Sequence, residues 1–294
     1  MYRRRLSPRE ILSQRAMPLS SRPAGRSIKV RLLICLVIAA FALFSYFSSS
    51  VYNPVTGEKQ HINITEDQEI ALGLQAAPQM AEQFGGLHPD QQAQAIVDAV
   101  GKNLVASSDA SKTNYPFEFH LLTDGETVNA FALPGGQIFI TAGLYKRLQT
   151  EGQLAGVLGH EIGHVVARHG AERIAKQQLT EGLTGALVLS TYDPSNPSTQ
   201  QTAQVAMVIG QLVNMKFGRE DELQSDRLGV RFISQAGYDP RALISVMKIL
   251  EEASGGARQP EFFSTHPNPE NRIEMIQQAI QEQFPNGLPG GLIQ

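Results

Sequence analysis

One predicted helix constrains the fold more than any other segment, because it places two histidines on one face. The helix begins after Thr150, where the letters TEGQ match a capping box, and Gly170 suits its C-terminal stop. His160 and His164 are four residues apart, so their side chains project about 40° apart around the helix axis. Glu161 lies beside the first histidine. The opposite face of this helix carries apolar residues, so the chain must fold in a way that buries that face.

The HExxH spacing is typical of zinc peptidases, in which the histidines bind the metal and the glutamate acts on a water. With seven histidines in 294 residues, a chance match is expected in roughly one such chain in a hundred. Two histidines and a glutamate bind zinc poorly without a third ligand. The rest of the chain must supply it.

Two downstream acids are the best candidates for completing the site. Glu222 and Asp226 are four residues apart on a predicted helix and therefore face the same way. One carboxylate can bind zinc while the other accepts a hydrogen bond from a ligand histidine. The alternative is a solvated acidic start of a helix. His169 is predicted to be structural, since it stands about 140° around the helix from His164 and cannot share its metal.

The zinc helix and three further motifs resemble the HtpX, BepA and type I CAAX prenyl protease family of membrane-associated zinc metallopeptidases. The further motifs are NAFALPGGQIFITAGL (Asn129–Leu144), RxxExxSD (Arg219–Asp226) and THPNPENRI (Thr265–Ile273). The resemblance covers residues 65–283. The chain departs from the family at Ser225, where Ala is usual, and it has one apolar segment where HtpX and the CAAX proteases have several membrane spans.

The resemblance implies roles for five residues and one zinc ion per chain. The expected zinc ligands are His160, His164 and Glu222, the catalytic base is Glu161, and the acid that holds a ligand histidine is Asp226. The expected activity is that of a metalloendopeptidase acting on extended or misfolded protein segments, in protein quality control of the cell envelope. The natural substrate and the oligomeric state are not predicted.

Two other functions remain open at this point. One is a chaperone-like peptide-binding protein with a structural zinc, against which the intact Glu161 argues. The other is a different HExxH hydrolase such as a deformylase. Such an enzyme would normally need a cysteine ligand, and the single cysteine, Cys35, lies in an apolar segment near the N-terminus.

His266, in the last motif, has three possible roles. The flanking prolines suit the start of a helix, where the ring would simply pack. The preceding loop, Gly255–Ser264, is of the kind that forms mobile lids, and a histidine there could donate to the oxyanion. It could instead occupy the fourth coordination position and block water. The blocking role is favoured, because an anchored protease needs restraint.

Charge and hydropathy separate an N-terminal region from the body. Residues 1–31 carry a net charge of +8 and the remainder −11. The uncharged run Leu32–Phe47 predicts a transmembrane anchor over residues 32–50, with a basic cytoplasmic leader at residues 1–31. A cleaved signal peptide is the alternative. The basic charge indicates topology rather than nucleic-acid binding, because it lies in a non-periodic leader.

This topology places the catalytic body outside the cytoplasm, as on a bacterial inner membrane facing the periplasm. The Arg- and Ser-rich leader leaves a mitochondrial inner membrane as the alternative.

The body predicts a mostly helical α+β domain of the zincin type. A linker at residues 51–64 precedes a metallopeptidase domain at residues 65–284, and residues 285–294 form a flexible tail. A small sheet is expected within Phe117–Thr141, directly before the zinc helix, and substrate is expected to lie along an edge strand within Val128–Thr141. Helices are expected over residues 65–106 (two), 142–148, 152–169, 172–190, 202–217, 221–236, 240–253 and 269–283.

Overall fold

The computed structural model describes residues 28–189, 217–254, 260–268 and 271–294. Its helices are α2 (Ile28–Ser48), α3 (Glu66–Gln83), α4 (Gln91–Ser107), η1 (Asp109–Lys112), α5 (Ala142–Tyr145), α6 (Glu151–Val166), α7 (His169–Leu189), α9 (Arg219–Gln235), α10 (Arg241–Ser254), α11 (Phe262–Thr265) and α12 (Arg272–Gln283). Its strands are β1 (Ser50–Tyr52), β2 (Lys59–His61), β3 (Glu118–Leu122), β4 (Ala130–Leu133) and β5 (Gln137–Thr141). The prediction of a mostly helical chain with a small sheet before the zinc helix is confirmed. The predicted helix at residues 202–217 lies almost wholly outside the described residues, as does most of the leader.

The small sheet has the order β3–β5–β4, so β4 is an edge strand. β5 is parallel to β3 and antiparallel to β4. A tight turn joins β4 to β5, and its two glycines, Gly135 and Gly136, have φ values of 83° and 102° that only glycine adopts without strain. A Cβ on Gly135 would lie 2.4 Å from the Ile70 Cα, so this turn lies directly on the backbone of α3.

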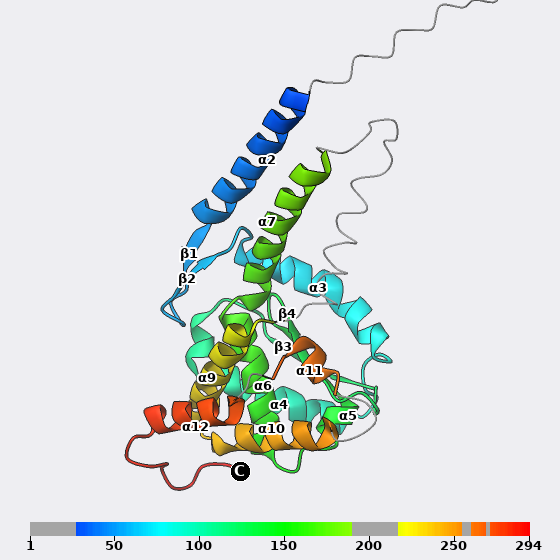
Figure 1. The fold of residues 1–294 in the computed structure, drawn as a ribbon. Helices are drawn as coiled ribbons and strands as arrows, with labels where there is room; N and C mark the ends of the chain where they lie inside the picture. The colour runs from blue at the N-terminus through cyan, green and yellow to red at the C-terminus, as the bar shows by residue number, and fades with distance from the viewer. Residues whose placement is uncertain (1–27, 190–216, 255–259, 269–270) are drawn as a thin grey trace, which may run out of the picture.

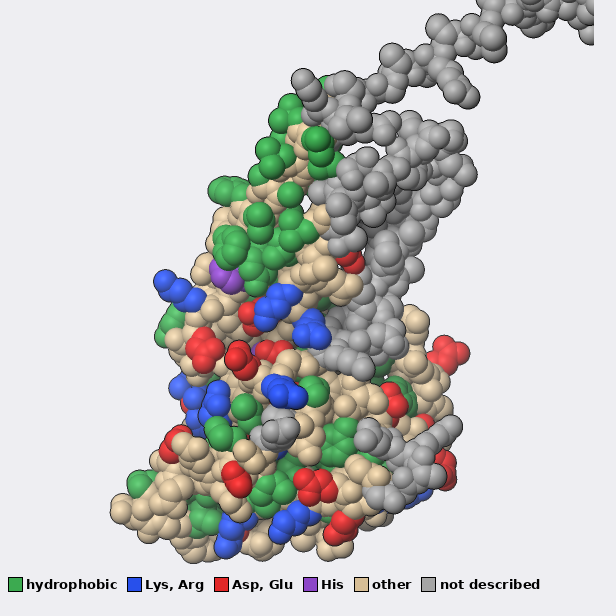
Figure 2. Space-filling view, viewed as in Figure 1, with side chains coloured by type: hydrophobic (Ala, Val, Ile, Leu, Met, Phe, Trp, Pro, Cys, Tyr) green, Lys and Arg blue, Asp and Glu red, His purple; other side chains and the backbone are tan. Residues whose placement is uncertain are grey.

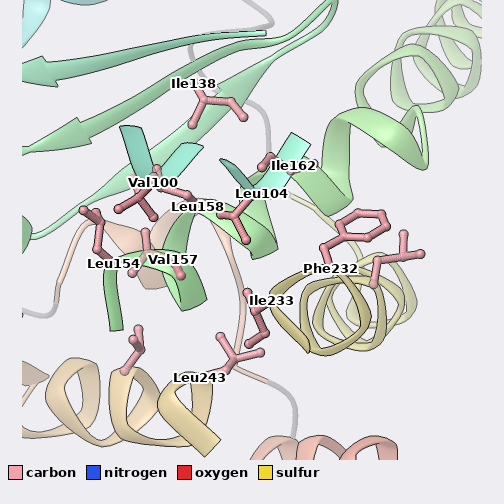
Figure 3. Close-up of a cluster of buried hydrophobic side chains, with 14 of the residues drawn as sticks. Val100, Leu104, Ile138, Leu154, Val157, Leu158, Ile162, Phe232, Ile233 and Leu243 are labelled. Carbon is pink, nitrogen blue, oxygen red and sulfur yellow. The ribbon is translucent and has the colours of Figure 1, made fainter. Parts of the chain in front are cut away.

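The zinc-motif helix α6 forms the centre of the hydrophobic core (Figure 3). Its residues Leu154, Leu158 and Ile162 are at most 3% exposed. They meet side chains from the surrounding elements, which include Val100 and Leu104 on α4, Ile138 on β5, Phe232 and Ile233 on α9 and Leu243 on α10. Burial on every side fixes the orientation of α6, and therefore of the two histidines.

The ends of α6 differ in part from the prediction. Thr150 is the N-cap, and its hydroxyl accepts from the Gln153 N–H at 3.2 Å, but Gln153 Oε1 accepts from the Gln149 N–H rather than completing a capping box. The stop at Gly170 is wrong, because α6 ends at Val166 and Gly170 lies inside α7.

Arg168 is the residue that separates α6 from α7. It adopts a left-handed conformation, with φ of 56°. Its guanidinium forms a buried ion pair with Glu69 on α3 and also donates to the Ile64 carbonyl. These tertiary contacts hold an unfavourable backbone conformation that residue preference alone would have assigned to glycine.

The N-terminal part rises from the body as α2, with α7 running beside it (Figure 1). The two helices approach closely at Gly182, where a Cβ would lie 2.9 Å from the Ala42 Cβ. The predicted linker contains an antiparallel hairpin of β1 and β2. Within the part of the chain that the structure describes, no helix is both long enough and apolar enough to cross a membrane.

The chain end makes contacts that the predicted flexible tail did not anticipate. The Ile293 N–H donates to the Gly237 carbonyl at 2.9 Å, and the Gly152 N–H donates to the Gln294 carbonyl at 3.0 Å. The residues before Ile293 are turn-forming, so the sequence does not indicate that the chain end pairs with the backbone near α10 and α6.

Candidate metal centre

The site is built where α9 packs closely against two glycines of α6. A Cβ on Gly159 would lie 2.7 Å from Ile233 Cγ2, and one on Gly163 would lie 2.9 Å from the Ser225 carbonyl oxygen. The Ser225 hydroxyl donates to the His160 carbonyl at 2.5 Å. The glycines in α6 therefore permit the close approach that brings the acids of α9 to the histidines.

Four buried side chains converge on one point: His160, His164, Glu222 and His266. Each offers a ligand atom, and these atoms lie within 4.8 Å of one another. The Nε2 atoms of His160 and His164 are 3.1 Å apart. Glu222 Oε1 lies 3.4 Å from His164 Nε2 and 3.1 Å from His266 Nδ1. The predicted ligands are thus brought together, and His266 joins them.

This donor set suits zinc. Imidazole nitrogens and one carboxylate are ligands that zinc binds in catalytic sites, with a tetrahedral arrangement of three or four protein groups. Two ring nitrogens at 3.1 Å, both also directed toward a buried carboxylate, form a concentration of lone pairs that a cation stabilises. The cluster is consistent with one zinc ion.

Glu161 lies beside the cluster with an unused carboxylate. The residue is fully buried, and neither of its side-chain oxygens has a hydrogen-bond partner among the described residues. Its Oε1 is 3.7 Å from His266 Nε2. Burial raises the pKa of the Glu161 carboxyl, although the neighbouring His266 and His160 oppose this. A buried carboxylate without partners is costly, so its retention here suggests a role in chemistry.

Asp226 lies on the far side of His160 from the cluster. Its Oδ1 lies 2.9 Å from His160 Nδ1, which leaves Nε2 directed at the cluster. Arg272 in turn binds Asp226, with Nε 2.7 Å from Oδ2 and Nη2 2.9 Å from Oδ1. The side chain of Arg272 is only 1% exposed. Asp226 therefore has both oxygens paired.

Sequence reasoning missed Arg272, although one signal was available. It is the first residue of α12, where a cation is unfavourable against the positive end of the helix dipole. An arginine in that position, at the start of an amphipathic helix, indicates a buried acidic partner. No comparable signal identifies the partner, Asp226, which lies 46 residues earlier in the chain.

The surroundings of the two histidines shift their pKa values in opposite directions. Burial lowers the pKa of His160, but hydrogen bonds to Asp226 and Glu222 outweigh it and raise the value to about 9. Burial lowers the pKa of His164 well below its ordinary value. Burial opposes ionisation of Glu222 and Asp226, but hydrogen bonds to the surrounding histidines lower the pKa of the Glu222 carboxyl, and Arg272 and His160 lower that of Asp226.

Aromatic rings cover two of the clustered histidines. Phe217 stacks on His164 at a centroid distance of 3.9 Å, and Phe262 stacks on His266 at 4.4 Å. His169 stays outside the four-residue cluster and lies behind His164. The covering rings and the burial of the ligands shield the cluster from solvent.

Comparison with known proteins agrees with this geometry. The sequence profile of peptidase family M48 matches residues 91–280. The beta-barrel assembly-enhancing protease of Escherichia coli is 34% identical over 181 residues, which are 60% of this chain and 37% of that protein. A putative beta-barrel assembly-enhancing protease of Vibrio cholerae is 32% identical over 250 residues, 83% of this chain and 50% of that protein.

A mitochondrial relative matches over a longer share of its own length. The mitochondrial metalloendopeptidase OMA1 of Schizosaccharomyces pombe is 29% identical over 269 residues, which are 90% of this chain and 76% of that protein. The chain spans half or less of the length of the two bacterial relatives above. The matched region contains all of the clustered residues, and the chain therefore belongs to peptidase family M48.

Proposed function

We propose that this protein is a zinc-dependent endopeptidase. The observation that carries the proposal is the convergence of four ligand atoms within 4.8 Å, beside a buried Glu161 carboxylate that has no hydrogen-bond partner among the described residues. A structural zinc site has no use for an unpaired buried carboxylate at its edge. Hydrolysis of a peptide bond does, because a proton must be moved at that position.

His160, His164 and Glu222 would hold the metal. When bound, zinc supplies a Lewis acid that polarises a peptide carbonyl and lowers the pKa of a water molecule to about 7. Glu161 would accept a proton from the attacking water and deliver it to the leaving amine. The raised pKa of its carboxyl suits this exchange, because the group must hold the proton between the two steps.

His266 would act as a fourth ligand that closes the site. Its Nδ1 is 3.1 Å from Glu222 Oε1 and 3.4 Å from His160 Nε2, so it lies at the point where the other ligand atoms converge. This geometry favours the blocking role over that of an oxyanion donor. Displacement of His266 by substrate would then open the site.

Substrate would add to the sheet along β4. This strand is the edge of the sheet, and its outer side has no partner strand among the described residues. Pairing along an edge aligns an extended chain through main-chain hydrogen bonds, without requiring a particular sequence. An enzyme of this kind would cleave extended or misfolded segments.

We also propose that α2 attaches the protein to a membrane. Seven of its large apolar side chains are at least 57% exposed, namely Leu32, Leu33, Leu36, Val37, Phe41, Phe44 and Phe47. Figure 2 shows apolar side chains covering α2 in that view. An exposed apolar surface of this size is typical of a site that contacts a membrane or another protein.

The cellular role would be protein quality control in the cell envelope. Two of the relatives are named for β-barrel assembly and one is a mitochondrial endopeptidase. A bacterial inner membrane facing the periplasm fits the charge asymmetry, with the mitochondrial inner membrane as the alternative.

The central experiment compares the purified full chain with Glu161→Gln. The wild type should bind about one zinc per chain and cleave an unfolded protein. Glu161→Gln should keep its zinc and lose about 10²-fold or more of its turnover, since only the proton transfer is removed. His160→Ala should lose stoichiometric zinc, and His120→Ala, on β3, should change neither. Full turnover by Glu161→Gln would refute the proposed mechanism.

A further inference from the structure

The side of His164 that faces away from the cluster is occupied by a second histidine. His169 Nδ1 lies 2.9 Å from His164 Nδ1. The other ring nitrogen of His169, Nε2, lies 2.8 Å from Gln224 Oε1 on α9. His169 is 3% exposed, so these contacts are its principal polar interactions. His164, His169 and Gln224 form a continuous hydrogen-bonded chain.

The chemistry of these atoms sets the direction of that chain. An amide oxygen can only accept a hydrogen bond, so the proton of His169 is on Nε2 and its Nδ1 carries a lone pair. His164 Nδ1 must then be the donor, which leaves the lone pair of His164 on Nε2. That is the nitrogen 3.1 Å from His160 Nε2 and directed at the cluster. The reverse direction would put a proton on His164 Nε2, where it would prevent metal binding.

The backbone explains why His169 can make this contact at all. On an uninterrupted helix its side chain would point about 140° away from His164. The left-handed Arg168 ends α6 and starts α7 in a new direction. This break turns the His169 ring back toward His164, with ring centroids 4.9 Å apart.

The arrangement parallels that of the other histidine ligand. His160 Nδ1 is held by Asp226, and His164 Nδ1 is held through His169 by Gln224. Both Asp226 and Gln224 belong to α9, the helix that also carries Glu222. One helix therefore supplies a carboxylate to the cluster and determines the orientation of both imidazoles.

We propose that His169 and Gln224 are positioning residues that fix the tautomer and orientation of His164 for metal binding. The proposal rests on the zinc site of the proposed function. Partners of this kind typically change metal affinity by about 10- to 100-fold. His169 therefore has a specific role beyond packing.

The test measures the zinc dissociation constant of the full chain by competition with a chelator, without any peptide substrate. His169→Leu and His169→Asn are a matched pair, because Leu and Asn have nearly the same shape but only Asn offers an acceptor where Nδ1 stood. Leu should weaken zinc binding about 10- to 100-fold, and Asn should restore most of that loss. Thermal melting of the metal-free variants checks that both fold.

A second variant acts from the other end of the chain. Gln224 lines a surface pocket of about 300 Å³, so Gln224→Met has room, and it removes the amide whose oxygen accepts from His169. It should weaken zinc binding several-fold. His120→Leu is the control, because His120 Nε2 makes the same kind of contact, 2.9 Å from Gln137 Oε1, on a sheet strand. Its zinc affinity should stay within about twofold of the wild type.

Three results would overturn the inference. Zinc affinity of His169→Leu within about threefold of the wild type would show that His169 only packs, and so would an Asn variant as weak as Leu. If His169→Leu does not fold, the Asn and Met variants decide, since wild-type affinity in Gln224→Met contradicts the proposed chain. A wild type that binds no zinc would refute the proposed function itself.

Discussion

Arg272 binds Asp226 through two parallel hydrogen bonds, 2.7 Å from Nε to Oδ2 and 2.9 Å from Nη2 to Oδ1. Such a paired contact fixes the carboxylate in a plane as well as neutralising it. Asp226 can then hold His160 Nδ1 without rotating away. Arg272 also contacts two of the four clustered side chains directly, Glu222 at 3.2 Å and His160 at 3.5 Å. The metal site thus depends on a residue that is not itself a member of the cluster.

Replacing Arg272 should therefore damage both stability and metal binding. Arg272→Met leaves the Asp226 charge buried without its partner, which is expected to cost about 3–5 kcal/mol in the free energy of unfolding. Arg272→Lys keeps the charge but not the paired geometry and should weaken zinc binding by about 10-fold. Denaturant unfolding and chelator competition measure the two effects.

Arg241 offers a matched control for that experiment. It makes a similar two-point contact with Asp239, but its side chain is 64% exposed, and Asp239 also accepts hydrogen bonds from the Arg241 N–H and from Gln294 Nε2 that the substitution leaves in place. Arg241→Met should cost less than about 1 kcal/mol and leave zinc affinity unchanged. Equal losses in the two variants would contradict a special role for Arg272.

Zinc affinity should increase with pH. His160 has a pKa of about 9 in the metal-free protein, held there by Asp226 and Glu222 against the effect of burial. Zinc can bind Nε2 only after that proton leaves, so each zinc should release about one proton at pH 7. The apparent affinity should rise by up to tenfold per pH unit and level off above pH 9.

The stability of the metal-free protein should change in the opposite sense. The folded pKa of His160 is above its unfolded value of about 6.5, so its contribution to stability is complete below pH 6.5 and is lost as the pH rises through 9.

Calorimetric titration with zinc, in buffers of different ionisation enthalpy, counts the protons that zinc binding releases. A zinc affinity independent of pH between 6.5 and 9 would contradict this assignment.

Gly163→Ala should separate the two helices of the site. Its Cβ would lie 2.7 Å from Ser225 Oγ and 2.9 Å from the Ser225 carbonyl oxygen, which is backbone and cannot turn aside. Although alanine favours a helix by about 1 kcal/mol over glycine, overpacking should destabilise the protein by about 1–3 kcal/mol. Zinc content should fall, because Glu222 moves with Ser225.

Gly290→Ala is the control for this substitution. A Cβ there meets nothing within 4 Å among the described atoms. Stability and zinc content should match the wild type. An unchanged melting temperature in Gly163→Ala would show that α9 can shift without cost.

His266→Ala should raise basal turnover of an unfolded substrate while the protein keeps one zinc. The expected cause is removal of a side chain whose Nδ1 lies 3.4 Å from His160 Nε2 and competes with water for the metal. The measurement is turnover at fixed substrate, with zinc content checked in parallel. A fall of about 10²-fold would assign His266 to the oxyanion instead. Unchanged turnover and zinc would leave it a packing role.

Local patterns in the sequence determined the parts of the site that lie within one helix. The spacing of His160 and His164 places both on one face because the α-helix has 3.6 residues per turn, and the same rule pairs Glu222 with Asp226. Thr150 caps α6 as predicted, and the apolar face of α6 opposite the two histidines is buried as predicted. These features depend only on neighbours within about four residues.

Only the tertiary structure decided which distant groups meet. Arg272 contacts Asp226 across 46 residues, and His266 contacts His160 across 106. Contacts between residues so far apart produce no periodic pattern in the sequence. The helix break at Arg168 was assigned to Gly170, because the ion pair with Glu69 that stabilises the break lies 99 residues away. That break also reorients His169. Backbone preferences of individual residues amount to about 1 kcal/mol, which buried long-range contacts readily exceed.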